Sequence, residues 1–242
     1  MSIEEKKEID VTERSVPRDG SPQALDRRLF MALHVFTGDG VDAEAALVEA
    51  ARDSGLECVL YRDVNDPRGV GLLCLSEDPA CFATTLRERL NAEPFQRLRH
   101  RPEMTMLGRT YAVGYEPDLE DWLLRKPRRA VLDPAWPWAV WYPLRRTGAF
   151  SALPHQEQRA ILAEHARIGI AYGQADLAHD TRLACHGMNA ADNEFVIGLV
   201  GRDLHPLSHL VQTMRRTRQT SEFIQSMGPF FVGHAIWRSR MP

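Results

Sequence analysis

The segment from Trp138 to His165 reads WAVWYPLRRTGAFSALPHQEQRAILAEH. Its first five residues are mostly aromatic or β-branched, which predicts a strand that carries Tyr142. After a short polar turn, the apolar spacing of residues 153–172 predicts a helix. This strand and helix belong to a pattern that extends through most of the chain, and the pattern decides the fold.

The predicted helix carries His165 on its apolar side. Apolar or small residues lie four and three positions before it and three and four positions after it, which puts them on one helical face: Ile161, Leu162, Ile168 and Gly169. An imidazole that points into an apolar interior needs a partner for at least one ring nitrogen. Neutral imidazole is also the commonest metal ligand. His165 is therefore either a core histidine bonded to a backbone carbonyl or a metal ligand.

The same periodicity predicts two consecutive βαββαβ units. The first has strands at 30–36, 56–63, 70–75 and 104–113, and helices at 41–54 and from residue 78. The second has strands at 138–142, 177–188, 195–200 and 230–237, and helices at 153–172 and 205–223. Two such units are ferredoxin-like repeats. Helices cover only one face of each sheet, so we expect an α+β fold in which the two sheets meet to form a dimeric α+β barrel.

Composition divides the chain into four segments. Residues 1–25 are charged and contain two prolines, which predicts a disordered or extended arm. Residues 26–115 form the N-terminal repeat, and residues 138–242 form the C-terminal repeat. Residues 116–137 connect them; this stretch is polar and rich in proline, with a short helix expected at 118–124.

Composition also narrows the class of protein. The chain has 242 residues, of which 44% are hydrophobic and 26% charged, as is usual for a globular protein. A net charge of -3 gives no support for nucleic-acid binding, and no apolar run approaches the roughly 18 residues of a membrane span. The N-terminus lacks the apolar core of a secretory signal. The four cysteines have no CxxC spacing and predict small buried side chains in a reducing compartment, so we expect a cytoplasmic protein: Cys58, Cys74, Cys81 and Cys185.

Ordered motifs in the second half carry a resemblance to a known family. They are Tyr142-Pro143-Leu144, Glu164-His165 with Gly169 and Tyr172, Asn193-Glu194-Phe195, Met214-Arg215-Arg216, Ser221 and the GPFFVG run at 228–233. In these residues the chain resembles the chlorite dismutase family of heme proteins and, within it, the coproheme decarboxylases. The N-terminal half matches in pattern rather than in motif.

The resemblance implies a heme cofactor, either coproheme or heme b, with His165 as the sole protein ligand of the iron. It also implies that Tyr142 is the tyrosine that forms a radical and attacks the propionates. A phenol suits that task because it can give up an electron and a proton together. The alternative for Tyr142 is a strand tyrosine with a hydrogen-bonded hydroxyl group.

The resemblance further implies that Arg216 and Ser221 anchor propionates. A guanidinium group can bind both oxygens of a carboxylate. The alternative is that Arg216 belongs to a solvated basic cluster at a helix C-terminus. Arg128 and Arg129 are weaker candidates for the same anchoring role. Three tryptophans either flank a large flat ligand or pack in the core: Trp136, Trp138 and Trp141.

Two positions depart from the family pattern. Chlorite-decomposing members carry an arginine thirteen residues after the proximal histidine, where this chain has Ala178 followed by His179. Arg182 is a more remote substitute, and a strand position of different parity would face elsewhere. We therefore do not expect chlorite decomposition. The second position is Gln219, which stands near the family's glutamate that accepts the N–H of the proximal imidazole.

The leading hypothesis is a peroxide-dependent enzyme that decarboxylates iron-coproporphyrin III to heme b. One alternative is a heme-b protein with another peroxidase or oxidase activity. Another is a non-catalytic heme carrier or sensor. The expected partners are coproheme or heme and hydrogen peroxide, without nucleic acid or a membrane span. The resemblance also implies a homo-oligomer, most often a pentamer.

Overall fold

The computed structural model describes residues 9–18, 20–38 and 40–241. Part of the predicted N-terminal arm is ordered: β1 (Glu13–Ser15) and β2 (Gln23–Leu25) pair as a short antiparallel hairpin. The Glu13 carboxylate accepts hydrogen bonds from the Arg109 guanidinium and the Ala112 backbone N–H, each at 2.9 Å. These contacts hold the hairpin on the first repeat, which the charged composition did not predict. Residues 1–8 of the predicted arm lie outside the described residues.

The N-terminal repeat is a four-stranded antiparallel sheet in the order β7-β3-β5-β4. A two-residue strand, β6 (Arg99–His100), pairs with the end of β3. The elements in chain order are β3 (Phe30–Thr37), α1 (Gly40–Asp53), β4 (Glu57–Asp63), β5 (Val70–Ser76), α2 (Ala80–Ala83), α3 (Thr85–Leu90) and β7 (Met106–Arg109).

The C-terminal repeat has the same topology, with the sheet order β9-β10-β8-β12. Its elements are β8 (Trp138–Arg146), α5 (Gly148–Ser151), α6 (His155–Gln174), β9 (His179–Ala184), β10 (Phe195–Gly201), α7 (Leu204–Met214), α8 (Arg218–Phe223), β11 (Ile224–Met227) and β12 (Phe231–Arg238). The predicted helix 205–223 is therefore two helices separated at Arg215–Thr217. The Thr217 hydroxyl donates to the Met214 carbonyl at 2.7 Å and competes with the helical backbone bonds.

The connecting segment holds a longer helix than the sequence predicted. A π-helical turn (Asp121–Arg125) runs directly into α4 (Lys126–Leu132). Pro127 is tolerated because it stands in the first turn of α4. The helix enters the space between the sheets, since its apolar residues belong to the central core: Leu123, Leu124, Ala130, Val131 and Leu132.

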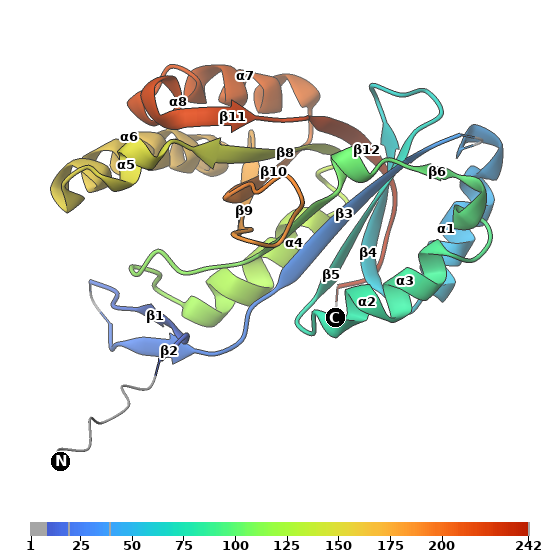
Figure 1. Cartoon of the computed structure of the whole chain (residues 1–242), viewed down its shortest axis with the longest axis horizontal. Coiled ribbons are helices and arrows are strands. Elements are labelled where there is room, and N and C mark those ends of the chain that lie inside the picture. The colour runs from blue at the N-terminus through green and yellow to red at the C-terminus, as the bar shows by residue number, and fades with distance from the viewer. Residues whose placement is uncertain (1–8, 19, 39, 242) are drawn as a thin grey trace, which may run out of the picture.

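The two sheets close into one barrel. Strand β4 pairs with β12, β7 meets β9 at the pair Arg109 and Ala184, and β8 pairs with both β10 and β12. Eight strands thus form a closed ring, and the helices of each repeat lie outside it (Figure 1). This arrangement confirms the predicted α+β fold with two ferredoxin-like repeats.

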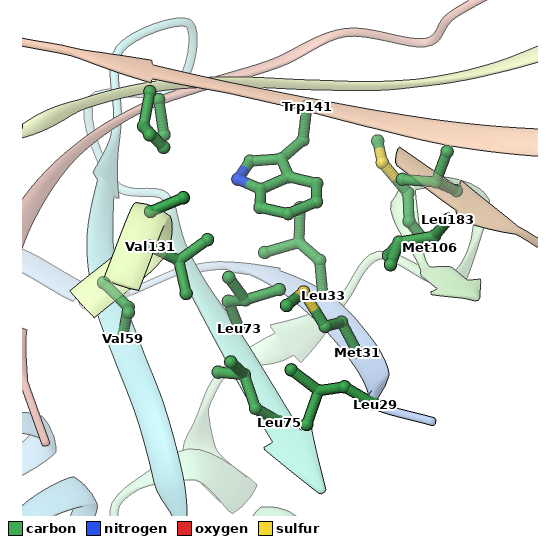
Figure 2. Packing of buried hydrophobic residues seen from close by; sticks show 14 of the residues in the cluster. Leu29, Met31, Leu33, Val59, Leu73, Leu75, Met106, Val131, Trp141 and Leu183 are labelled. Atoms are coloured by element: carbon green, nitrogen blue, oxygen red, sulfur yellow. The ribbon is translucent and has the colours of Figure 1, made fainter. Parts of the chain in front are cut away.

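Apolar side chains fill the barrel interior. Figure 2 shows Trp141 pointing from its strand toward Leu33, with leucine, methionine and valine side chains around them. Gly198 on the neighbouring strand gives the indole its place, because a Cβ atom there would lie 2.4 Å from a Trp141 ring carbon. The interior is thus a packed core, so a ligand of any size must bind elsewhere.

Outside the barrel, each repeat has its own apolar layer between sheet and helices. The N-terminal outer layer consists of the buried residues Phe36, Leu47, Ala51, Leu56, Cys58, Leu60, Val70, Leu72, Cys74, Leu86, Phe95 and Leu98 and the partly buried residues packed on them. The C-terminal outer layer consists of the buried residues Val140, Tyr142, Leu144, Ala178, Leu199, Leu207 and Leu210 and the partly buried residues packed on them. All four cysteines are free thiols. Within the described residues, no helix is both long and apolar enough to cross a membrane.

Candidate functional site

The helix α6 presents His165 toward the C-terminal outer layer. Ile161 is buried one turn earlier, and Ile168 packs on that layer one turn later. Leu162, which the spacing placed on the same face, is 40% exposed and lies off it. Burial, and then the positive charge of Arg182, lowers the pKa of His165, so the imidazole is neutral near pH 7.

The ring of His165 is oriented by the break between α7 and α8. Its Nδ1 lies 3.5 Å from the Thr217 hydroxyl oxygen, at the outer limit of a hydrogen bond. The Thr217 hydroxyl hydrogen is already donated to the Met214 carbonyl, which leaves the oxygen as the acceptor for an Nδ1–H. In that tautomer Nε2 carries a free lone pair, as a metal ligand requires.

A second polar atom near this break has no partner. The Oε1 of Gln219, on α8, is buried, and no hydrogen-bond donor reaches it within the part of the chain that the structure describes. A buried carbonyl oxygen without a donor is costly and calls for an explanation. Helix α8 lies against α6, where the Arg218 backbone N–H donates to the Glu164 carboxylate at 3.2 Å. Gln219 therefore lies on the helix that contacts the helix of His165.

Across from α6, three strands present their side chains in rows. The strand register aligns Tyr142 with Ile197 and Ile197 with Arg182. The next row aligns Val140 with Leu199 and Leu199 with Asp180. Because alternate residues of a strand share a face, all of these side chains point toward the outer layer that α6 covers.

Tyr142 lies at the centre of the C-terminal outer layer. It is 5% exposed, and its ring stacks on Phe230 with centroids 4.6 Å apart. Burial, and then the negative charge of Asp180, raises the pKa of Tyr142 well above its usual value. The phenol is therefore protonated throughout the neutral range.

The residues after α6 divide between two faces. Ala178 is buried in the C-terminal outer layer, and Asp180 and Arg182 share its parity and its face. Arg182 is thus on the side of the sheet that faces His165. His179 has the opposite parity: its ring stacks on Trp136 at 3.6 Å, and its Nε2 lies 2.8 Å from the Asp176 carboxylate. The structure does not bring His179 together with His165.

The candidate anchoring residues are also divided. Arg216 is exposed at the end of α7, and the Ser221 hydroxyl donates to the Thr217 carbonyl one turn earlier. Both stand beside the break that orients His165. Arg128 instead binds the carboxylates of Glu57, at 2.9 Å, and Glu77, at 3.2 Å, in the other repeat. The structure therefore separates Arg128 from the C-terminal cluster.

The three tryptophans of this region lie in three different environments. Trp141 fills the barrel, Trp136 stacks on His179, and only Trp138 packs on the C-terminal outer layer. They do not form the joint aromatic wall that one of the two sequence interpretations required. Sequence reasoning also missed Thr217 and Asp180. The even spacing of Ala178, Asp180 and Arg182 was the signal that could have found Asp180.

Comparisons with known proteins agree with this architecture. The family model for chlorite dismutase matches residues 85–236, which is more than half of the chain. No curated protein sequence matches the chain.

Solved structures of this family share the fold at low sequence identity. A heme-binding protein from Thermus thermophilus is 17% identical, with a TM-score of 0.68 over 92% of this chain and 95% of that one. An arginine-to-lysine variant of chlorite dismutase from Candidatus Nitrospira defluvii is 14% identical, with a TM-score of 0.65 over 87% and 92%. A tryptophan-to-phenylalanine variant of that enzyme in complex with cyanide is similar to the same degree, with 14% identity and a TM-score of 0.65 over 87% and 91%. The chain therefore belongs to the chlorite dismutase family.

Proposed function

We propose that this protein binds heme between α6 and the sheet of the C-terminal repeat, and that it decarboxylates coproheme to heme b with hydrogen peroxide. The observation that carries the proposal is a half-buried, neutral His165 on the helix that covers the incompletely buried C-terminal outer layer. In the C-terminal outer layer, twelve apolar residues are only partly buried, against seven that are fully buried. Apolar surface left open around a single neutral imidazole is what a large, flat, apolar ligand would cover.

The residues present fit such a group. Within the described residues, no three His, Cys, Asp or Glu side chains gather as a metal site. A lone imidazole with a free Nε2 suits a metal whose other ligands come from a porphyrin. In this proposal Thr217 fixes the ring from the Nδ1 side. The unpartnered oxygen of Gln219 is a further acceptor beside α6, and it supplies less electron push than a carboxylate would.

The exposed cation of Arg216 and the hydroxyl of Ser221 are the groups we assign to the propionates. Both stand at the rim of the layer, where the charged end of an apolar ligand would meet water. Ala178 leaves room on the sheet side because its side chain is a single methyl group. Arg128 and His179 receive no role, since each is engaged with a carboxylate outside this layer.

Bound heme would supply a centre that hydrogen peroxide can oxidise. For each reacting group, one propionate, one hydrogen peroxide and one proton give one vinyl group, one carbon dioxide and two waters. We assign the oxidised side chain to Tyr142. Its buried phenol keeps its proton in the resting protein and can lose one electron and one proton together. The stacked ring of Phe230 holds the phenol in one orientation, which serves the positioning that the reaction needs.

The visible spectrum of purified protein mixed with coproheme tests binding, and a peroxide titration followed by mass spectrometry of the porphyrin tests the reaction. The proposal expects a Soret band and then the loss of one or two carboxyl groups. Intact coproheme after peroxide, together with stable binding of heme b, would assign the protein to another heme-b oxidation or to heme transport.

We also propose that the protein is a homopentamer in the cytoplasm. Two large apolar side chains of α6 support self-association, since Leu162 is 40% and Ile170 58% exposed. Light scattering of the purified protein measures the oligomeric state. A monomer at micromolar concentration would contradict the assembly without affecting the heme site.

A further inference from the structure

An ion pair stands on the sheet face that looks toward His165. The Arg182 Nε lies 3.0 Å from the Asp180 Oδ2, and the two side chains are 32% and 34% exposed. The guanidinium also lies 5.5 Å from the ring of Trp122. The indole and the carboxylate together hold the cation close to its own strand.

Asp180 and Arg182 are the charged members of three aligned rows of side chains. Three aligned rows of β8, β10 and β9 face the layer. Besides Asp180 and Arg182, their members are Tyr142, Val140, Leu144, Phe195, Ile197, Leu199 and Ala184. A small molecule that lies against these three rows therefore meets a cation and an anion that are paired with each other.

The charges of Asp180 and Arg182 both affect residues of the proposed heme site. The Arg182 charge lowers the pKa of His165, while Asp180 raises it, and Asp180 also raises the pKa of Tyr142. His179 and Asp176 face away, so they do not take part in this balance.

We infer that Asp180 determines which oxidant the site accepts: by neutralising Arg182, it favours a neutral peroxide over an anionic oxidant. This inference rests on the proposed function. An anion could approach the free terminal N–H groups of Arg182 only against the negative charge of the neighbouring Asp180 carboxylate. Neutral hydrogen peroxide can accept a hydrogen bond from Arg182 and donate one to Asp180 while the pair stays intact. Asp180 thus acts through Arg182 and is a specificity-determining residue.

The test compares an anionic and a neutral ligand in the protein reconstituted with ferric heme b. Fluoride and imidazole affinities are measured from the visible spectrum at constant pH and ionic strength. Asp180→Asn should tighten fluoride binding by roughly three- to fivefold, the upper range for a partly exposed ion pair, and should change imidazole binding less than about twofold. Asp176→Asn is the matched control. It removes a carboxylate that lies away from this face and pairs with Arg202 at a distance of 2.9 Å, so it should change neither the fluoride nor the imidazole affinity.

The pair mechanism is separated from simple charge removal by a double-mutant cycle. If Asp180 acts by pairing with Arg182, Asp180→Asn should raise the fluoride affinity less when Arg182 has already been replaced. We expect the change in the logarithm of the affinity to be at most half as large in Arg182→Gln as in the unmodified protein. An equal gain in both backgrounds, or parallel shifts for fluoride and imidazole, would overturn the inference and leave the heme site standing. Failure of the unmodified protein to form a Soret band with heme b would overturn the proposed function and this inference with it.

Discussion

Among the described residues, the N-terminal outer layer has twelve buried apolar residues and eight partly buried ones, whereas the C-terminal outer layer has seven buried and twelve partly buried. Both layers lie between a sheet of the same topology and helices in corresponding positions. The N-terminal helices close over their sheet, while α6 and α7 leave their side of the barrel incompletely covered. Because the two scaffolds are equivalent, the layer with more partly exposed apolar side chains is the one to which we assign the proposed ligand.

The polar residues follow the same division. The N-terminal outer layer faces the pair His34 and His100, whose ring nitrogens lie 3.3 Å apart and satisfy each other. In the C-terminal repeat, the contacts among residues 9–18, 20–38 and 40–241 leave His165 with a long contact to Thr217 and Gln219 with an oxygen that has no partner. The two histidine rings at the N-terminal outer layer thus contact each other, whereas two polar side chains of the C-terminal repeat keep atoms available to bind a ligand.

The strongest test of this comparison is His165→Ala. We expect the affinity for heme or coproheme to fall by more than about 100-fold, because the variant removes the imidazole that we propose as the iron ligand. The fold should remain, since the side chain is not part of a buried core cluster. His155→Ala, on the exposed first turn of the same helix, is the control and should bind normally. Unchanged affinity and Soret position in His165→Ala would refute the ligand assignment.

Tyr142→Phe separates the role of the phenol from that of the ring. Phenylalanine keeps the stacking on Phe230, so coproheme binding should be retained. Carbon dioxide release on peroxide addition should drop by at least about 100-fold, because phenylalanine is far harder to oxidise than a phenol. Tyr172→Phe is the control: its hydroxyl contacts His209 and Thr213 at the α6–α7 contact. Normal turnover in Tyr142→Phe would make Tyr142 a structural residue.

A pair of core truncations compares the two layers directly. Leu47→Ala, in the N-terminal outer layer, should lower the free energy of unfolding by about 2–5 kcal/mol, as is usual for a fully buried leucine. Ile168→Ala, in the C-terminal outer layer, should cost less than about 1.5 kcal/mol, because its side chain is only partly buried. Denaturant titration without ligand measures both. Equal losses would mean that the two layers are equally closed.

Hydrogen exchange tests whether a ligand closes the open layer. At a heme concentration about 100 times the dissociation constant, binding should stabilise the native state by about 2.7 kcal/mol. The added protection should concentrate in α6, α7 and β8, and amides of α1 and β5 that open locally should change little. Uniform protection of both repeats would show that the layers open together.

The sequence predicted the repeats because alternation and helical spacing are local signals. On β8 the structure separates Trp141, which fills the barrel, from Tyr142, which faces the helices; strand alternation explains this, although the sequence alone left Trp141 as either a core residue or part of a ligand wall. The same parity rule places Asp180 and Arg182 beside Ala178 and turns His179 away, although His179 is the nearer neighbour in sequence. The break at Thr217 was missed, although the apolar spacing of residues 205–223 stops at Met214 and no apolar residue follows before Phe223. The ion pairs of Arg128 depend on contacts between segments that are far apart in the chain, which no local pattern records.

The closed N-terminal outer layer also predicts how the stability of the protein depends on pH. Burial, and then the nearby His100, lowers the pKa of His34 to about 4, from a usual value near 6.5. The folded state therefore binds a proton less readily than the unfolded state, so the contribution of neutral His34 to stability is present above pH 6.5 and is lost as the pH falls toward 4. Between pH 8 and pH 5 the free energy of unfolding should fall by about 2 kcal/mol more in the unmodified protein than in His34→Gln, which has no titrating ring. Urea titrations at the two pH values measure this difference. A variant that loses as much stability as the unmodified protein would show that His34 does not titrate in this way, and that the closed layer tolerates a charge at that position.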